Sequence, residues 1–206
     1  MSNPREIINI RQLLEKRYQS LDLGPYNELL GKVEARFTMM LYGPSGSGKS
    51  VFALRLADHL AKTYGKVLYN SHEERDNQTI QQRCLEWKID APKLYVGRAL
   101  CFDRMMDKIE RNKYRVVFID SLQYMDFTYE QLKEMRSRFS RRKIALIMIS
   151  FGSSSGNPDR AKDHLHASDV KCFFKGGHLH IISRYLNHPV DHQLFIMNKS
   201  NQQTLF

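Results

Sequence analysis

The feature that most restricts the fold of this chain is a glycine-rich segment placed between two hydrophobic ones. Residues 37–42, FTMMLY, form a short apolar run, GPSGSGKS follows at 43–50, and residues 50–64 carry apolar side chains at helical spacing. A strand that enters a tight glycine turn and leaves it as a helix is the start of a βαβ unit. The sequence therefore predicts an α/β protein built on a parallel sheet.

The glycine-rich segment also carries chemistry, because it fits the pattern G-x-x-x-x-G-K-S/T at each constrained position. Such a loop turns successive backbone N–H groups toward phosphate oxygens at the positive end of the following helix. We predict that ATP binds here with Mg²⁺, with Lys49 on the β- and γ-phosphates and the Ser50 hydroxyl on the metal. The predicted nucleotide-binding residues are Gly43, Pro44, Ser45, Gly46, Ser47, Gly48, Lys49, Ser50 and Val51.

Strand-like and helix-like segments alternate along the chain up to residue 150. Strands are predicted at 37–42, 66–71, 93–97, 115–120 and 144–150, and helices at 5–20, 50–64, 77–88, 102–112 and 128–143. This alternation indicates a central, mostly parallel β-sheet flanked by helices. After a loop at 151–163, pieces at 170–174, 178–186 and 192–197 predict C-terminal antiparallel strands, with a hairpin through Gly176 and Gly177.

The length of 206 residues favours one domain over two. We divide the chain into an N-terminal helix and linker (1–30), an ATP-binding domain (31–198) and a tail (199–206). No apolar run is long enough to span a bilayer and the first residues lack the core of a signal peptide, so we expect no membrane association. Three scattered cysteines, Cys84, Cys101 and Cys172, indicate reduced thiols and a cytoplasmic location.

Acidic residues follow two of the predicted buried strands. Asp120 ends the strand 115–120, at the sheet edge where the phosphate loop also lies, and can hold Mg²⁺ directly or through water. It could instead cap the next turn. Glu73 and Glu74 follow the strand 66–71, where a carboxylate can polarise water for attack on the γ-phosphate. The alternative for this HEER segment is a solvated charged turn.

The segments GPSGSGKS, VLYNSHEERDNQTIQQRC, VVFIDSLQ and IALIMIS together resemble the RecA-like P-loop ATPase superfamily, in particular its RadA/Sms, KaiC and DnaB-helicase branches. The resemblance implies a RecA-like P-loop NTPase fold in a compact, single-domain member. It also implies that Glu73, the first of the pair, is the catalytic glutamate. Self-association as a dimer, ring or filament and a role in DNA recombination, repair or replication follow from the same likeness.

Two positions depart from the family pattern. Phe151 stands where the family has a Gln or His that senses the γ-phosphate, so Ser150 or Ser153 would have to substitute or the sensing step is lost. The family's Lys-x-Arg pair on a late strand is reduced to Arg184, with Ile182 in place of the Lys. The resemblance makes Arg184 a candidate catalytic arginine that acts on the nucleotide of a neighbouring subunit, against the alternative of an ordinary surface arginine.

The composition is strongly basic, with 32 Lys and Arg against 22 Asp and Glu and a formal net charge of +10. This charge favours a polyanionic partner, and DNA, single-stranded in preference, is the leading one. The candidate nucleic-acid contacts are Arg136, Arg138, Arg141, Arg142, Arg160 and Lys162. The cations of the 128–143 helix could instead face an acidic neighbouring subunit or solvate their helix.

In the resembled family, the loops after the 115–120 and 144–150 strands contact DNA. The corresponding segments here are 122–130 and 152–164. Tyr124, Phe127 and Tyr129 in the first segment either stack on bases or cover the edge of the sheet. Two His-x-His pairs lack the partners of a metal site, and in HLHIIS the alternation favours one polar face of a strand.

The sequence therefore predicts an ATP-binding RecA-like ATPase that depends on DNA. One alternative is a nucleotide-regulated DNA-binding or loader protein that hydrolyses ATP slowly, which Phe151 favours. The other is a P-loop nucleoside or nucleotide kinase. A kinase would close an arginine-bearing lid over its site to exclude water, and the sequence has no recognisable segment of that kind.

Overall fold

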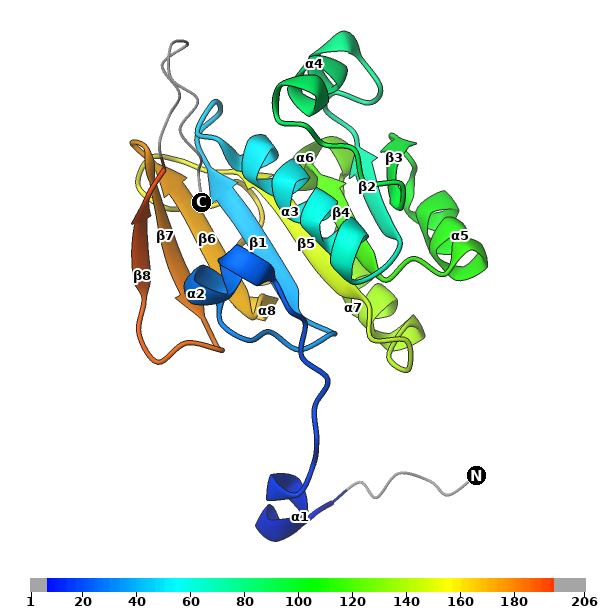
Figure 1. The fold of residues 1–206 in the computed structure, drawn as a ribbon, viewed down its shortest axis with the longest axis vertical. Helices are drawn as coiled ribbons and strands as arrows, with labels where there is room; N and C mark the ends of the chain where they lie inside the picture. Colours follow the sequence, from blue (N-terminus) through cyan, green and yellow to red (C-terminus); the bar gives the residue numbers. More distant parts are fainter. Residues whose placement is uncertain (1–6, 195–206) are drawn as a thin grey trace.

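A twisted sheet runs through the centre of the computed structural model, which describes residues 7–194. Its strand order is β3-β2-β4-β5-β1-β6-β7-β8 (Figure 1). The strands from β3 to β6 in this order are parallel, and β7 and β8 follow as antiparallel additions. The strands are β1 (Thr38–Gly43), β2 (Val67–Ser71), β3 (Leu94–Arg98), β4 (Val116–Asp120), β5 (Ala145–Phe151), β6 (Val170–Lys175), β7 (His178–Ser183) and β8 (Val190–Gln193).

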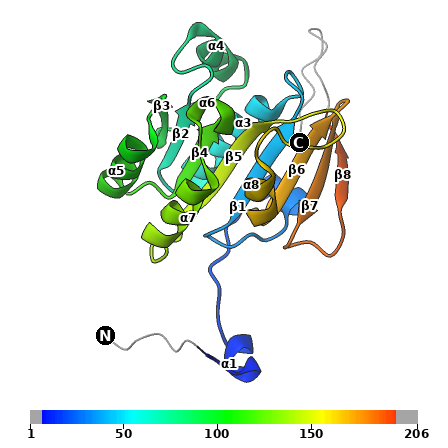
Figure 2. The same cartoon turned by 180° about the vertical axis from the view of Figure 1, so that it is seen from behind.

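Helices cover both faces of this sheet and divide the core into two layers (Figures 1 and 2). Successive side chains of β1 point to opposite faces, so Met39 and Leu41 pack under α3 while Met40 and Tyr42 face α5 and α7. Because both faces are covered, all residues of β1, β2 and β4 are buried. The helices are α1 (Ile10–Leu14), the 3-10 helix η1 (Gly24–Tyr26), α2 (Asn27–Leu30), α3 (Lys49–Thr63), α4 (Gln78–Glu86), α5 (Phe102–Asn112), α6 (Leu122–Met125), α7 (Tyr129–Arg138) and α8 (Lys162–Ala167).

The C-terminal strands form as the sequence predicts. β6 and β7 are joined by Gly176 and Gly177, whose φ angles of 57° and 78° suit a tight hairpin turn of the type that glycine favours. Along β7, Leu179 and Ile181 are buried, and the alternating His178 and His180 lie on the other face. Residues 7–194 contain no cluster of three or more metal-ligating side chains. Of the predicted strand 192–197, residues 195–197 lie outside the described part, as does the tail 199–206.

The prediction for the N-terminal 30 residues is wrong in two respects. The described part of the helix expected at 5–20 is helical only at α1, which stands away from the body of the molecule (Figure 1). Its Leu14 is 78% exposed, and a short helix without a packing partner is marginal in water. The expected linker, in contrast, belongs to the core. Leu23 and Leu30 are fully buried, because η1 and α2 pack against the sheet.

The predicted helix at 128–143 ends early, and beyond the N-terminal segment two short helices were not predicted. Helix α7 stops at Arg138 because the chain must turn back into β5, and Lys143 takes a left-handed φ of 52° in that turn. The missed elements are α6 and α8, with four and six residues, which are too short to display a helical period. The basic residues after Arg138 therefore lie in a turn.

Two further findings concern the cysteines and the membrane. Each of the three cysteines is free, and Cys172 is buried in the core, where desolvation raises the pKa of its thiol. Among residues 7–194, no helix has both the length and the apolar character needed to cross a bilayer.

Candidate nucleotide-binding site

The phosphate loop lies between β1 and α3, at the carboxyl end of the parallel strands. Gly48 caps α3 with a left-handed φ of 96°, so the first amides of the 15-residue helix face the loop. Gly43 has a different reason to be glycine. A Cβ atom there would lie 2.2 Å from the carbonyl oxygen of Phe174 on β6. The loop thus combines an anion-binding helix end with a backbone that touches the next strand.

Lys49, the first residue of α3, folds back over the loop. Its Nζ donates hydrogen bonds to the carbonyl oxygens of Gly43 at 2.9 Å and Pro44 at 2.6 Å. Desolvation lowers the pKa of this buried ammonium, and the nearby Glu73 and Asp120 carboxylates oppose the shift. A buried ammonium held by loop carbonyls, beside the amino end of a helix, is suited to receiving a phosphate group.

A cleft of about 350 Å³ opens beside the loop. It is lined by Ser45, Gly46, Ser47, Gly48, Lys49, Ser50, Val51, Glu73, Glu74, Arg83, Ile149 and Phe151. Seven of the nine predicted nucleotide-binding residues line this space, and Gly43 and Pro44 lie behind it as acceptors for Lys49. The volume lies in the ordinary range for small-molecule sites.

Two neighbouring glutamates follow β2 and are used differently. Glu74 forms an ion pair with Arg83 of α4 at 2.7 Å, and both side chains are largely shielded from solvent. Glu73 lines the cleft, and its backbone N–H donates to the Asp120 carbonyl at 3.3 Å, but its carboxylate has no hydrogen-bond or ion-pair partner among the described residues. Partial burial, and then repulsion by Glu74, raises the pKa of Glu73 above its ordinary value, against the pull of Lys49 and Arg83. Of the two glutamates, Glu73 is therefore the one whose carboxylate is unpaired at the cleft.

Asp120 ends β4 directly opposite Ser71 of β2. The hydroxyl of Tyr69 donates to its Oδ2 at 2.6 Å, whereas its Oδ1 is buried without a partner. Burial raises the pKa of this carboxyl to about 6, and Glu73 and Glu74 add to the shift while the Tyr69 hydrogen bond opposes it. The hydroxyl oxygens of Ser71 and Ser121 are also buried and unpaired.

These orphaned oxygens match the chemistry of a magnesium ion. Mg²⁺ prefers oxygen ligands and usually keeps several of its waters, so a carboxylate with nearby hydroxyls suits it. Ser50, which lines the cleft, and Asp120 are the residues that would hold the ion. A buried unpaired carboxylate oxygen is costly unless a ligand, ion or water completes its hydrogen bonding.

The end of β5 differs from the family pattern, as the sequence indicates. Phe151 lines the cleft and packs against Tyr124 with ring centroids 5.6 Å apart. Ser150 is fully buried and accepts a hydrogen bond from Gln123 at 2.8 Å, and Ser153 contacts Ser155 in the loop. Neither hydroxyl is among the groups that line the cleft.

Two residues at this edge were missed by the sequence reasoning. Gln123 donates to Ser150 and accepts from the backbone N–H of Phe151 at 3.2 Å, so it connects the end of β4 to the end of β5. Arg83 reaches the cleft from α4. The position of Gln123, three residues after Asp120, could have indicated that it lies at this edge. No local pattern in the sequence indicates that Arg83 reaches the cleft.

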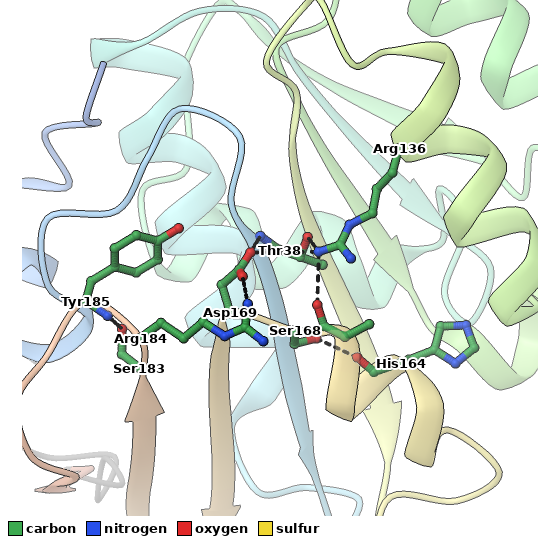
Figure 3. Close-up of polar contacts among 9 residues, drawn as sticks. Thr38, Arg136, His164, Ser168, Asp169, Ser183, Arg184 and Tyr185 are labelled. Carbon is green, nitrogen blue, oxygen red and sulfur yellow. Dashed lines mark hydrogen bonds and ion pairs between the residues drawn. The ribbon is translucent and has the colours of Figure 1, made fainter. Parts of the chain in front are cut away.

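The predicted catalytic arginine lies at the other end of the sheet. Arg184 follows β7, which runs antiparallel to β6, and its guanidinium contacts Asp169 at 3.0 Å (Figure 3). Arg136 of α7 reaches the same place and donates to the Thr38 hydroxyl and to the carbonyl of Ala167. The structure therefore separates Arg184 from the Lys49 and Glu73 of its own chain.

The other predicted nucleic-acid contacts differ in their exposure and in their partners. Arg138 pairs with Glu110 at 2.6 Å, and Arg142 donates to the carbonyl of Glu110 at 3.2 Å. Arg141 and Lys162 are exposed, and Arg160 is 87% exposed beside Asp159. Of the three aromatic candidates, Phe127 is buried in the core, Tyr129 is half-buried and Tyr124 is exposed.

Comparisons with known proteins identify a family and distant relatives of this chain. Residues 4–137 match the AAA_25 family, which is described as an AAA domain. A DNA repair protein RadA of Listeria monocytogenes is 27% identical over 192 residues, which cover 87% of this chain and 42% of that protein. A DNA repair protein RadA of Campylobacter jejuni is 33% identical over 85 residues, 41% of this chain and 19% of that protein. The chain spans less than half the length of either relative.

A solved structure supports the fold independently. The crystal structure of a KaiC-like protein from Pyrococcus horikoshii OT3 superposes with a TM-score of 0.66, covering 86% of this chain and 93% of that one at 15% identity. The mostly parallel sheet, the added antiparallel strands and the phosphate loop define a RecA-like P-loop ATPase superfamily fold. Within that class, the chain belongs to the AAA_25 family.

Proposed function

We propose that this protein hydrolyses ATP in a DNA-dependent manner and acts in DNA repair, recombination or replication. The observation that carries the proposal is the pairing pattern of the two glutamates in the cleft. Glu74 is neutralised by Arg83, and Glu73 remains unpaired beside the phosphate loop. A free carboxylate with a raised pKa, placed at a phosphate site, is suited to general-base catalysis.

Each residue of the site has a separate role in the proposed hydrolysis of ATP. The loop amides and the Lys49 ammonium bind the phosphates, and the ammonium leaves the Gly43 and Pro44 carbonyls to do so. Glu73 orients a water molecule and accepts its proton as the water attacks the γ-phosphate. Phe151 and Ile149 form an apolar wall of the cleft, which limits the access of other water molecules.

Ser50 and Asp120 would hold Mg²⁺ in this proposal. The ion supplies charge stabilisation to the phosphates when it is bound. Asp120 would bind it as a carboxylate, so protons compete with the metal below the raised pKa of about 6.

The site needs a second copy of the chain if Arg184 takes part. Arg184 lies level with the start of β1, and the phosphate loop begins at its end, five residues further along. At about 3.3 Å per residue, this separation is roughly 16 Å, which is farther than an arginine side chain extends. Arg184 would therefore contact the nucleotide of a neighbouring protomer, and self-association is part of the proposal.

The DNA role rests on charge and on the relatives. The net charge of +10 favours nucleic acid, and two relatives are named DNA repair proteins. We assign the contact to Arg160 and Lys162, because the segment that leaves β5 at the nucleotide end carries Arg160 and then Lys162, the first residue of α8, and both side chains are exposed. Arg141 and Lys143 are also exposed but lie at the opposite end of the sheet, before β5 begins.

The test is phosphate release from ATP by the full chain, with and without single-stranded DNA. DNA should raise the rate, and Lys49→Ala should abolish it. Charge reversal at Arg160 and Lys162 should remove the stimulation and lower the salt dependence of DNA binding by about two units of slope or less. The matched reversal at Arg141 and Lys143 should leave both intact. A rate that does not respond to DNA contradicts the proposal, and phosphate appearing on a nucleoside acceptor would instead indicate a kinase.

A second function is favoured by one observation, the aromatic ring of Phe151 in the cleft. Phe151 cannot donate a hydrogen bond to a γ-phosphate, so the site could bind ATP and hydrolyse it slowly, as a nucleotide-regulated DNA-binding or loader protein. Phe151→Gln separates the two functions. A rate that rises at least about tenfold in this variant supports the slow switch, and an unchanged or lower rate supports the ATPase.

A further inference from the structure

An aspartate at the end of the sheet opposite to the nucleotide cleft holds together three separate elements. Asp169 lies between the start of β1 and the residue that follows β7, directly before β6 (Figure 3). Its backbone N–H donates to the carbonyl of Thr38 at 2.8 Å, and its own carbonyl accepts from the N–H of Arg184 at 3.0 Å. The backbone of Asp169 therefore fixes Arg184 in register with β1.

The side chain of Asp169 also links Thr38 to Arg184. Its Oδ2 accepts from the backbone N–H of Thr38 at 2.9 Å, and its Oδ1 accepts from Nη1 of Arg184 at 3.0 Å. The Nη2 atom of Arg136 lies 3.8 Å from Oδ2. Because a backbone amide and a half-buried arginine hold the carboxylate in place, it offers Arg184 a fixed point of attachment.

The exposures of the two partners differ strongly. The Asp169 side chain is 14% exposed and that of Arg184 is 68% exposed. Among the described residues, Asp169 is the sole hydrogen-bond or ion-pair partner of the Arg184 guanidinium. An ion pair with one partner so exposed contributes little to stability. The arrangement is better suited to presenting a guanidinium at the surface, with donors left over for an anion.

We propose that Asp169 is a positioning residue, which aims Arg184 at the nucleotide bound by a second copy of this chain. The inference rests on the proposed ATPase function and on Arg184 acting between subunits. Arg136 supports it by holding Asp169 from the side of α7. Asp169 itself contacts no substrate and acts through Arg184 alone.

The first experiment mixes inactive variants of the full chain and measures ATP hydrolysis. Lys49→Ala lacks a working phosphate site but keeps Arg184, and Arg184→Ala has the reverse defect. Activity that returns when the two are mixed supports action between subunits. Asp169→Asn should behave like Arg184→Ala, so it regains activity with Lys49→Ala and does not regain it with Arg184→Ala.

The second experiment is a double-mutant cycle. Asp169→Asn should lower kcat at least about tenfold with little change in KM for ATP, a fraction of the effect of losing the arginine itself. In the Arg184→Ala background, the same change should have no further effect, because its only route of action is gone. Asp169→Glu, which keeps the charge, should recover part of the rate. Glu110→Gln, which breaks the exposed ion pair with Arg138, is the matched control and should leave kcat unchanged.

The outcomes separate this inference from the function on which it rests. If the wild-type protein releases no phosphate, the proposed function fails and the inference fails with it. If Arg184→Ala keeps the wild-type rate, ATP hydrolysis stands but Arg184 has no role between subunits, and the inference fails. If Arg184→Ala is slow and is complemented while Asp169→Asn is as fast as wild type, the inference alone is wrong. Additive losses in the double variant would likewise overturn it, since they indicate a structural role. If Asp169→Asn does not fold, the rates of Asp169→Glu and of its double variant with Arg184→Ala decide the matter in the same way.

Discussion

At the carboxyl ends of the parallel strands, Asp120 keeps one buried oxygen without a partner, and the Glu73 carboxylate has no partner among the described residues. At the amino ends, in contrast, Asp169 is held by a backbone amide and two arginines. Both ends belong to the same sheet. Within the described residues, four buried oxygens at the carboxyl ends, in Ser71, Glu74, Asp120 and Ser121, have no partner. A buried polar atom without a partner lowers stability, so this group of oxygens indicates that a ligand completes their hydrogen bonding. The following predictions test that difference, from the largest effect to the smallest.

The largest effect is expected at Lys49. Replacement by alanine removes the buried ammonium from the phosphate loop, and the rate of ATP hydrolysis should fall by about 10²–10³-fold or to background. Equilibrium binding of a fluorescent ATP analogue should weaken in parallel. Lys62→Ala is the control on the same helix, since Lys62 pairs with Asp58 and Asp90 at the surface. A Lys49→Ala variant that binds and hydrolyses normally would remove the basis for placing nucleotide at this end of the sheet.

Substitutions of the two glutamates should have different effects, one on the rate of hydrolysis and the other mainly on stability. Glu73→Gln should lower kcat by about 10²-fold while ATP binding is retained, because the variant cannot accept the proton of water. Glu74→Gln should leave more of the rate and should lower the thermal stability, because it breaks the shielded ion pair with Arg83. Steady-state kinetics and thermal unfolding of both variants measure the contrast. Equal losses of rate would mean that the pairing pattern does not identify the base.

For Asp120 we predict in which direction the stability of the protein changes with pH. Its pKa in the folded protein is about 6, above the ordinary 3.8, so the folded state favours the protonated carboxyl. The stability that this group contributes is therefore fully present below pH 3.8 and is lost as pH rises through about 6. Asp120→Asn should stabilise the nucleotide-free protein above that pH by roughly 2–3 kcal/mol, and the gain should vanish toward about pH 4.

Urea unfolding between about pH 4 and pH 8 measures this effect, and MgATP should reverse it at neutral pH, since only the wild type gains the metal contact. Asp58→Asn is the matched control. Asp58 is also largely buried, but it accepts from the backbone N–H of Ala91 and pairs with Lys62, so its loss should destabilise by about 1–3 kcal/mol. If Asp120→Asn destabilises the protein to the same degree at pH 8, Asp120 is a structural residue.

The smallest effects are expected at the opposite end of the sheet. Arg136→Ala should cost about 1–2 kcal/mol of unfolding free energy, because it removes hydrogen bonds to Thr38 and Ala167 and a contact with Asp169. Arg138→Ala on the same helix should cost less than about 1 kcal/mol, since its pair with Glu110 is exposed. Denaturant unfolding compares the two. Equal costs would show that the Asp169 contacts do not stabilise this end.

Much of the fold could be predicted because local patterns encode it. The apolar runs of β1, β4 and β5, the glycine loop and the Gly176–Gly177 hairpin each have a signature within a few residues, and the structure confirms them. The N-terminal segment could not be predicted in this way. The sequence of residues 5–20 has a helical period, but none of the described residues 7–20 is buried, while Leu23 and Leu30, in a stretch that resembles a linker, fill the core.

The functional residues, too, could be predicted only where a local pattern marks them. The phosphate loop, Glu73 and Asp120 could be located because each follows a strand directly, and the carboxyl ends of parallel strands meet at one edge. The basic residues gave no such information. Arg136, Arg138 and Arg142 belong to one charged segment, yet Arg136 is half-buried among polar partners and the other two contact Glu110.

The sequence by itself determined the strand–loop–helix unit, the phosphate-binding pattern and the order of the elements, because backbone preferences and side-chain periodicity act over short distances. Only the tertiary structure decided which charges are free. The hydroxyl that Arg136 contacts lies 98 positions away along the chain, and Arg184 meets its aspartate 15 positions away, across a pair of strands. Such pairings depend on how strands are ordered in the sheet, and that order is set by the burial of both sheet faces rather than by any local run of residues.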